Sequence, residues 1–122
     1  MNIPHELHSI GKYQVIRPQA RLNDIDTIAD LNELVEALID RDIFFIAIAL
    51  ENVSAIHSLF IKLLTVAYKK IKPKHGRLCL ISPDKSTLDI MRILNLDAYI
   101  AVYPDEAAFR NAILSSEKGA NG

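Results

Sequence analysis

Ser58 is the residue of this sequence with the clearest chemical use, because it stands where an apolar helix is expected to begin. Its oxygen can cap the helix by accepting a hydrogen bond from an unpaired backbone N–H, which typically contributes about 1 kcal/mol. Its hydroxyl can also accept a phosphate, which would meet free N–H groups and the positive end of the helix dipole. Residue type alone favours the cap, since serine is a common N-cap residue.

Other residues that could do chemistry are few and scattered. The four histidines lack the spacing and the cysteine companions of a metal site; they are His5, His8, His57 and His75. His57 adjoins Ser58, but neighbours in a chain rarely point at each other, and no third member of a catalytic triad can be identified. Only four glycines occur, and no glycine-rich phosphate loop is present. We therefore expect no enzymatic activity and no cofactor.

The stretch from Phe44 to Ile71 contains Ser58 and organises the chain. FFIAIAL is short, apolar and rich in β-formers, which favours a strand buried on both faces. A polar turn follows, and HSLFIKLLTVAYKKI then has helical periodicity. Because this helix is apolar around most of its circumference, we expect Leu59 or Phe60 to be exposed in the isolated chain and to lie in a partner or homodimer interface. The alternative is that both belong to the core.

Further elements surround this unit. Strands are expected at 6–10, 13–17, 77–81 and 98–103, and helices at 26–40, 83–94 and 105–114. Gly11-Lys12 suits a type II′ hairpin turn, and Ser82-Pro83 suits a helix start. This order predicts one α/β domain over residues 1–114, with a mixed β-sheet and helices mainly on one face of it. Residues 115–122 are small and polar, and we expect them to form a disordered tail.

Composition excludes several functional classes. The 122 residues include 14 Lys and Arg against 15 Asp and Glu, without the basic excess of a nucleic-acid-binding protein. No apolar run approaches the roughly 20 residues that span a bilayer, and no secretory signal is visible, so membrane insertion is not expected. Cys79, the single cysteine, cannot form an internal disulfide. We expect a cytoplasmic protein.

The pattern from about Tyr13 to Leu114 resembles a STAS domain, the fold of bacterial anti-sigma-factor antagonists and of sulphate-transporter tails. VIRPQARLN resembles the second strand and turn of that family. LENVSAIHSLFIKLL resembles its signature, in which a strand leads to hydrophobic positions, an Asp-Ser pair and a helix. Val53 and Ile56 take the hydrophobic positions, and Ser58 falls on the signature serine.

The resemblance implies a non-enzymatic partner switch. An unphosphorylated STAS antagonist binds an anti-sigma factor that is a serine kinase, and phosphorylation of the signature serine breaks the complex. The partner-binding positions it implies here are Asn23, Asp24, His57, Ser58, Leu59, Phe60 and Lys62.

Several residues depart from the family's pattern; Ala49 stands where Asp or Asn is common, Ala20 and Asn23 replace the usual Gly and Asp, and three departures adjoin Ser58. His57 replaces its Asp, Leu59 replaces a second hydroxyl residue, and Phe60 replaces its Gly. We expect the two large side chains to hinder a kinase, which leaves Ser58 a helix cap and a poor phosphate acceptor. Two alternative functions remain: a phosphorylation-independent scaffold subunit of a transporter or signalling assembly, and a small-molecule sensor.

Overall fold

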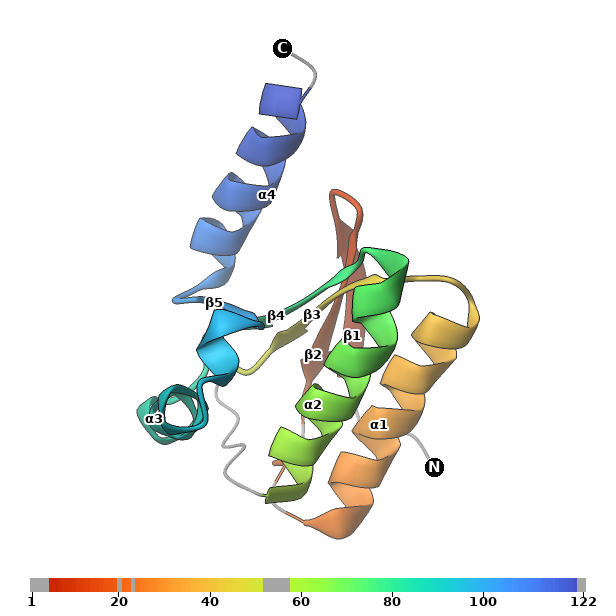
Figure 1. Ribbon diagram of the computed structural model, residues 1–122, viewed down its shortest axis with the longest axis vertical. Coiled ribbons are helices and arrows are strands. Elements are labelled where there is room, and N and C mark those ends of the chain that lie inside the picture. Colours follow the sequence, from red (N-terminus) through yellow and green to blue (C-terminus); the bar gives the residue numbers. More distant parts are fainter. Residues whose placement is uncertain (1–4, 20, 23, 52–57, 121–122) are drawn as a thin grey trace.

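The computed structural model describes residues 5–19, 21–22, 24–51 and 58–120 of the chain. Strands and helices alternate after an N-terminal hairpin, as the sequence predicts (Figure 1). The elements are β1 (His5–Ile10), β2 (Tyr13–Pro18), α1 (Ile25–Asp40), β3 (Phe45–Ala49), α2 (Ser58–Ile71), β4 (Arg77–Ile81), α3 (Lys85–Ile93), β5 (Ala101–Tyr103) and α4 (Glu106–Ala120), with 3₁₀ turns η1 (Lys72–Lys74) and η2 (Leu96–Ala98).

The five strands form one mixed sheet in the order β1-β2-β3-β4-β5. β1 pairs antiparallel with β2, and the remaining neighbours pair in parallel, which confirms the predicted sheet. At the hairpin turn Gly11 has a φ of 56°, whereas the φ of Lys12 is not positive. A type I′ turn requires a positive φ at both central residues, so this turn is not of that type. β2 ends at Pro18, which has no N–H to continue the ladder.

Side chains of the central strands alternate between two buried clusters. Ile46, Ile48 and Leu50 pack toward α1 and α2, whereas Ala47 and Ala49 belong to the cluster on the opposite face. This pattern explains the continuous apolar run of β3, because both faces of the strand are covered.

Helices α1 and α2 lie side by side over one face of the sheet (Figure 1), and Met91 of α3 joins the same cluster. Helix α4 is the exception, because its Phe109 and Ile113 pack in the cluster of the opposite face. The prediction that the helices lie mainly on one face is therefore confirmed. No helix of the described residues is both long and apolar enough to cross a bilayer.

The ends of several elements differ from the sequence prediction, most clearly those of α3, β5 and α4. Helix α3 begins at Lys85, not Pro83, because Asp84 is its N-cap and accepts a hydrogen bond from the Thr87 backbone N–H at 2.9 Å. Residues 96–98, immediately before and at the expected start of the last strand, form a 3₁₀ turn, which shortens β5. Helix α4 continues to Ala120, so the tail expected after Leu114 is helical through that residue.

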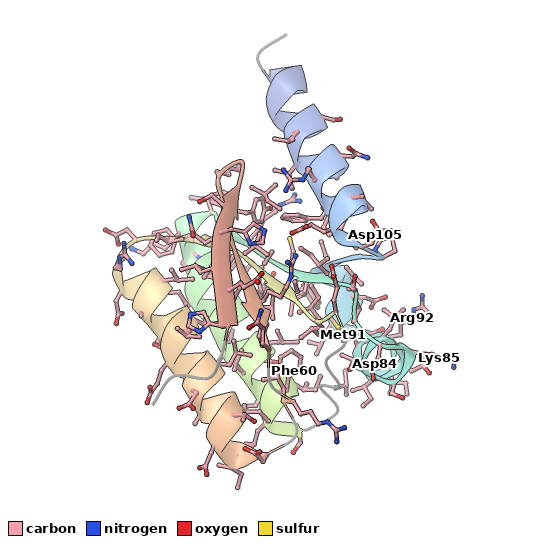
Figure 2. The ribbon with its side chains drawn as sticks, turned by 180° about the vertical axis from the view of Figure 1, so that it is seen from behind. Phe60, Asp84, Lys85, Met91, Arg92 and Asp105 are labelled. Atoms are coloured by element: carbon pink, nitrogen blue, oxygen red, sulfur yellow. The ribbon has the colours of Figure 1, made fainter. Side chains whose placement is uncertain are left out.

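Ser82, which we expected to cap α3, instead has a φ of 55° and connects the ends of two strands. Its Oγ donates to the Pro104 carbonyl at 3.0 Å, and its backbone N–H donates to the Tyr103 carbonyl at 2.8 Å. Asp105 then caps α4 by accepting from the Ala108 backbone N–H at 2.7 Å. Asp84 and Asp105 thus begin the two helices that follow β4 and β5 (Figure 2).

Candidate functional site

The first turn of α2 separates its residues sharply by exposure. Ser58 is the first helical residue and is exposed, Leu59 is half-buried, and Phe60 is fully buried. Lys62 lies one turn after Ser58 and is also exposed. The residue before the first helical residue is the N-cap position, and here it is His57, which lies outside the described residues. The capping role of Ser58 therefore stays a prediction.

The buried position of Phe60 contradicts part of the sequence prediction. It is 0 % exposed and points into the body of the molecule, in the cluster between α2 and the sheet (Figure 2). The prediction that Phe60 contributes to a partner surface, and that it crowds a kinase approaching Ser58, is therefore wrong. The physical reason is that Phe60 shares one helix face with Leu63, Leu64 and Ala67, all of them buried.

A groove of about 310 Å³ runs between the first halves of α1 and α2, and we call it the α1–α2 groove. Most of its wall is apolar, and Ile25 on the α1 side is 65 % exposed. Lys62 and Asn32 supply polar groups. Its lining residues are Ile25, Ile28, Ala29, Asn32, Leu59, Lys62, Leu63 and Val66.

Asp24 fixes the α1 side of this groove. It is the N-cap of α1, and its Oδ1 accepts from the Thr27 backbone N–H at 2.8 Å and from Thr27 Oγ1 at 3.0 Å. Such a cap sets where the helix begins, and it holds the next residue, Ile25, at the groove. Asp24 is itself exposed.

The two helices begin at the same end of the molecule (Figure 1). The structure therefore brings four of the seven predicted site residues to one end: Asp24, Ser58, Leu59 and Lys62. Phe60 is excluded by burial, and Asn23 and His57 lie outside the described residues.

Sequence reasoning missed the α1 side of the groove, namely Ile25, Ala29 and Asn32. Ile25 could have indicated this side of the groove from the sequence, because it is an apolar residue next to the N-cap that does not belong to the buried stripe of α1. The residues of that stripe are Ile28, Leu31, Val35 and Leu38.

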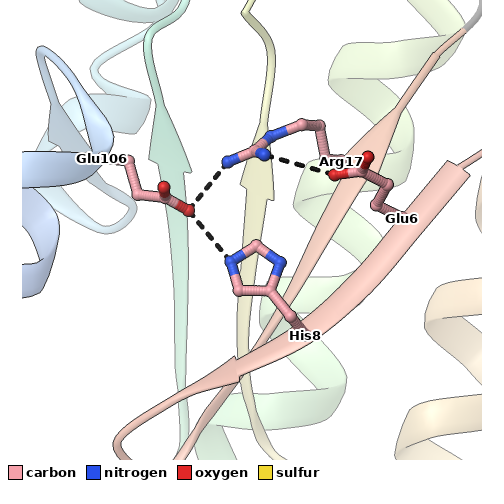
Figure 3. Close-up of polar contacts among 4 residues, drawn as sticks. All are labelled: Glu6, His8, Arg17 and Glu106. Carbon is pink, nitrogen blue, oxygen red and sulfur yellow. Dashed lines mark hydrogen bonds and ion pairs between the residues drawn. The ribbon is translucent and has the colours of Figure 1, made fainter.

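The opposite face of the sheet holds an aromatic cluster and a polar network, and Figure 3 shows the network. Glu106 Oε1 at the start of α4 lies 2.7 Å from Arg17 Nη2 and 2.9 Å from His8 Nε2, and Arg17 Nη1 lies 3.3 Å from Glu6 Oε2. These contacts join α4 to the β1–β2 hairpin.

Beside this network, Phe109 packs edge-on against Tyr13 and Tyr103, each at a centroid distance of 5.1 Å. Burial raises the pKa of the Cys79 thiol to about 11 and also raises the pKa of Tyr13. A thiol kept protonated is a weak nucleophile, so this cluster serves packing. In the described part of the chain, no three His, Cys, Asp or Glu side chains are placed to share a metal ion.

Several solved structures have a similar fold, and among them are proteins described as anti-sigma-factor antagonists. An anti-sigma-factor antagonist STAS domain protein from Planctomyces limnophilus matches with a TM-score of 0.77 and 21 % identity, over 90 % of this chain and 97 % of that chain. A putative anti-sigma factor antagonist from Thermotoga maritima matches with a TM-score of 0.72 and 20 % identity, over 83 % and 85 %.

The Bacillus cell fate determinant SpoIIAA in its phosphorylated form matches with a TM-score of 0.70 and 16 % identity, over 89 % of this chain and 99 % of that chain. Identities this low demonstrate a shared fold. No curated protein sequence matches the chain.

The family model for the STAS domain matches residues 8–109, which is most of the chain. That range includes the whole α1–α2 groove, the start of α2 and all the parallel strands. This chain belongs to the STAS domain family.

Proposed function

We propose that this chain is a regulatory protein-interaction domain without catalytic activity of its own, and that it binds an anti-sigma factor of the serine-kinase type. The proposed docking surface is the α1–α2 groove together with the exposed start of α2. The observation that carries the proposal is the position of this groove, whose wall includes Leu59 and Lys62, directly beside the exposed Ser58. The cytoplasm, where such partners act, is the proposed location.

The composition of the groove suits protein docking. Protein interfaces combine an apolar centre with a polar rim, and a few well-packed residues contribute most of the binding energy. Ile25, Leu59 and Val66 offer the apolar centre, while Lys62 and Asn32 supply hydrogen-bond donors. Because Phe60 anchors the same turn of α2 in the core, the surface is held in place before a partner arrives.

Ser58 gives this surface a means of regulation. Ser58 is exposed, and of the two side chains expected to hinder a kinase Phe60 is buried, so only the half-buried Leu59 remains beside the hydroxyl. A phosphate there adds about −1.5 to −2 charges beside an apolar groove, which opposes docking of a partner that must desolvate it. The start of α2 and the ammonium of Lys62, one turn away, would both stabilise the modified serine.

A phosphorylation-independent scaffold is the second candidate. The half-buried Leu59 favours it, because a large apolar side chain directly after the serine adds contact area where the family has a hydroxyl. Both functions use the same groove and differ in whether Ser58 is modified.

Calorimetric titration with the host's purified anti-sigma factors of the kinase type tests the proposal. We expect Leu59→Asp and Lys62→Glu each to weaken binding about tenfold or more, because one introduces a charge into the groove and the other reverses one. Lys85→Glu on α3 is the matched control, since Lys85 is exposed and far along the chain from the groove lining. Absence of binding by every such factor, or equal binding by all four proteins, would contradict the proposal.

A further inference from the structure

A second groove lies at the other end of α2, where the helix approaches the segment between α3 and β5. Its volume is about 370 Å³. An adjoining cavity of about 310 Å³ has Tyr68, Lys72 and Tyr99 in its lining as well, so the two lie next to each other. We call the larger part the basic groove; its lining is Thr65, Tyr68, Lys69, Lys72, Pro73, Leu96, Tyr99 and Ile100.

Tyr68 and Tyr99 line both the basic groove and the adjoining cavity. The rings of Tyr68 and Tyr99 lie 5.7 Å apart between centroids, and Tyr99 is 59 % exposed. Lys72 Nζ lies 5.8 Å from the centre of the Tyr68 ring. Tyrosines of this kind supply rigid contact area at low entropic cost, and they are enriched at protein interfaces.

The charge around the groove has one dominant sign. From Leu59 to Arg77 the chain contains no Asp or Glu, and its basic residues are Lys62, Lys69, Lys70, Lys72, Lys74 and Arg77. Lys70 pairs with Glu36 on α1. Within the described residues, Lys69 and Lys72 form no ion pair, and Asp97 is the one acidic residue in the lining of either cavity.

We propose that the basic groove binds an acidic peptide segment of another protein. An apolar side chain of the segment packs against Pro73, Leu96 and the ring of Tyr99, while its carboxylates pair with Lys69 and Lys72. This contact is separate from the α1–α2 groove and does not depend on the function proposed for it.

The geometry favours a peptide over a compact phosphate ligand. The groove adjoins the C-terminal end of α2, where the negative end of the helix dipole disfavours a concentrated negative charge. A peptide distributes its carboxylates over the lysine side chains and also covers the accessible apolar side chains of Pro73 and Leu96.

Selection from a phage library of random peptides of about 12 residues tests this proposal without knowledge of the partner. The full chain is the target, and the double variant K69E/K72E is used to deplete peptides that bind elsewhere. We expect the enriched sequences to carry a net negative charge and at least one aromatic or leucine residue.

The best peptide is then synthesised with a fluorescent label, and its Kd is measured by anisotropy. K69E/K72E should raise Kd about tenfold or more, and about 0.5 M NaCl should weaken binding to the wild type strongly. Tyr99→Ala should also weaken binding. Lys74→Glu is the matched control, because Lys74 carries the same charge in the same segment but lines neither cavity; its Kd should stay close to that of the wild type.

Thermal unfolding of each variant confirms that the chain still folds. The proposal is overturned if the library yields no enriched peptides, if the enriched peptides are neutral or basic, or if K69E/K72E binds as tightly as Lys74→Glu does. Inorganic tripolyphosphate is the competing probe. If it binds the groove as tightly as the selected peptide, the site belongs to a phosphate ligand and the peptide assignment is wrong.

Discussion

Leu59 and Phe60 are adjacent in the chain, yet the helix directs one toward the α1–α2 groove and the other into the core. We predict that Phe60→Ala lowers the free energy of unfolding by about 3–5 kcal/mol, because it removes a fully buried ring and leaves a cavity. Leu59→Ala should cost about 1 kcal/mol, since its side chain is only half-buried. Urea denaturation monitored by circular dichroism measures both changes.

If Phe60→Ala does not fold, Phe60→Leu replaces it, with an expected loss of about 1–2 kcal/mol. Equal losses for Leu59→Ala and Phe60→Ala would show that the first turn of α2 is oriented differently from the structure described here.

Ser58 carries the proposed regulation, and its test is a modification assay. We predict that the host's kinase-type anti-sigma factor adds one phosphate to the wild type and none to Ser58→Ala, because Ser58 is exposed. The phosphorylated chain should bind that factor about tenfold or more weakly, since the added charge must be desolvated at the interface. Intact-mass spectrometry and calorimetry measure the two effects. An unmodified wild type that still binds would favour the phosphorylation-independent scaffold.

We predict that Cys79 affects the free energy of unfolding at alkaline pH. Its folded-state pKa of about 11 lies above the usual value of 9.0, so the folded chain keeps the proton that the unfolded chain releases. Stability should therefore be unaffected by this group below pH 9 and should fall between about pH 9 and 11, by up to about 1.4 kcal/mol per pH unit. Cys79→Ala should give a flatter decline of unfolding free energy over that range. Equal slopes would contradict the assignment of this thiol to the buried cluster.

Helix α4 depends at its start on the contacts of Glu106 with Arg17 and His8. Arg17 Nε is buried and has no hydrogen-bond partner in the described residues, so losing Glu106 would leave the guanidinium more poorly paired. We predict that Glu106→Ala costs about 1 kcal/mol, a value that allows for solvent screening of these partly exposed groups.

The exposed pair of Lys85 and Asp89 provides the control, because Lys85→Ala should change stability by less than about 0.5 kcal/mol. Chemical denaturation of the two variants decides the comparison. Equal losses would mean that the network does not stabilise the contact between α4 and the hairpin.

The middles of the elements were predictable from the sequence, whereas several ends were not. Apolar runs identified β3 and β4, and helical spacing identified α1 and α2, because burial of one or two faces imposes those periods. The start of α3 was misassigned because Ser82-Pro83 and Asp84 are both typical of helix starts, and only Asp84 forms the capping hydrogen bond. The small, polar residues after Leu114 are compatible with either a helix or a tail.

The candidate site was predictable in part for a related reason. The signature placed Ser58 at the start of α2 and identified Leu59 and Lys62 beside it. It could not show which of two adjacent apolar residues faces the core, because α2 is apolar around most of its circumference. Ile25 and Asn32 were missed because they enter the groove only through the packing of α1 against α2.

In the whole molecule, α2 contributes to two separate surfaces. Its first turns border the α1–α2 groove, and its last turns border the basic groove. The face of the sheet opposite α2 is covered in part by α4, whose later turns extend away from the sheet (Figure 1). If both proposed docking surfaces are used, the two ends of α2 allow the domain to contact two partners without a change of fold.

The central claim is that the α1–α2 groove and the start of α2 form the docking surface for an anti-sigma factor. Hydrogen–deuterium exchange of the chain, alone and in complex with the host factor that binds it, tests this claim most directly. Binding at this surface should slow exchange at residues 24–32 and 58–66 and leave exchange in β1 and in α4 unchanged. Protection confined to α4 and the β1–β2 hairpin, with none in the first turns of α1 and α2, would contradict it.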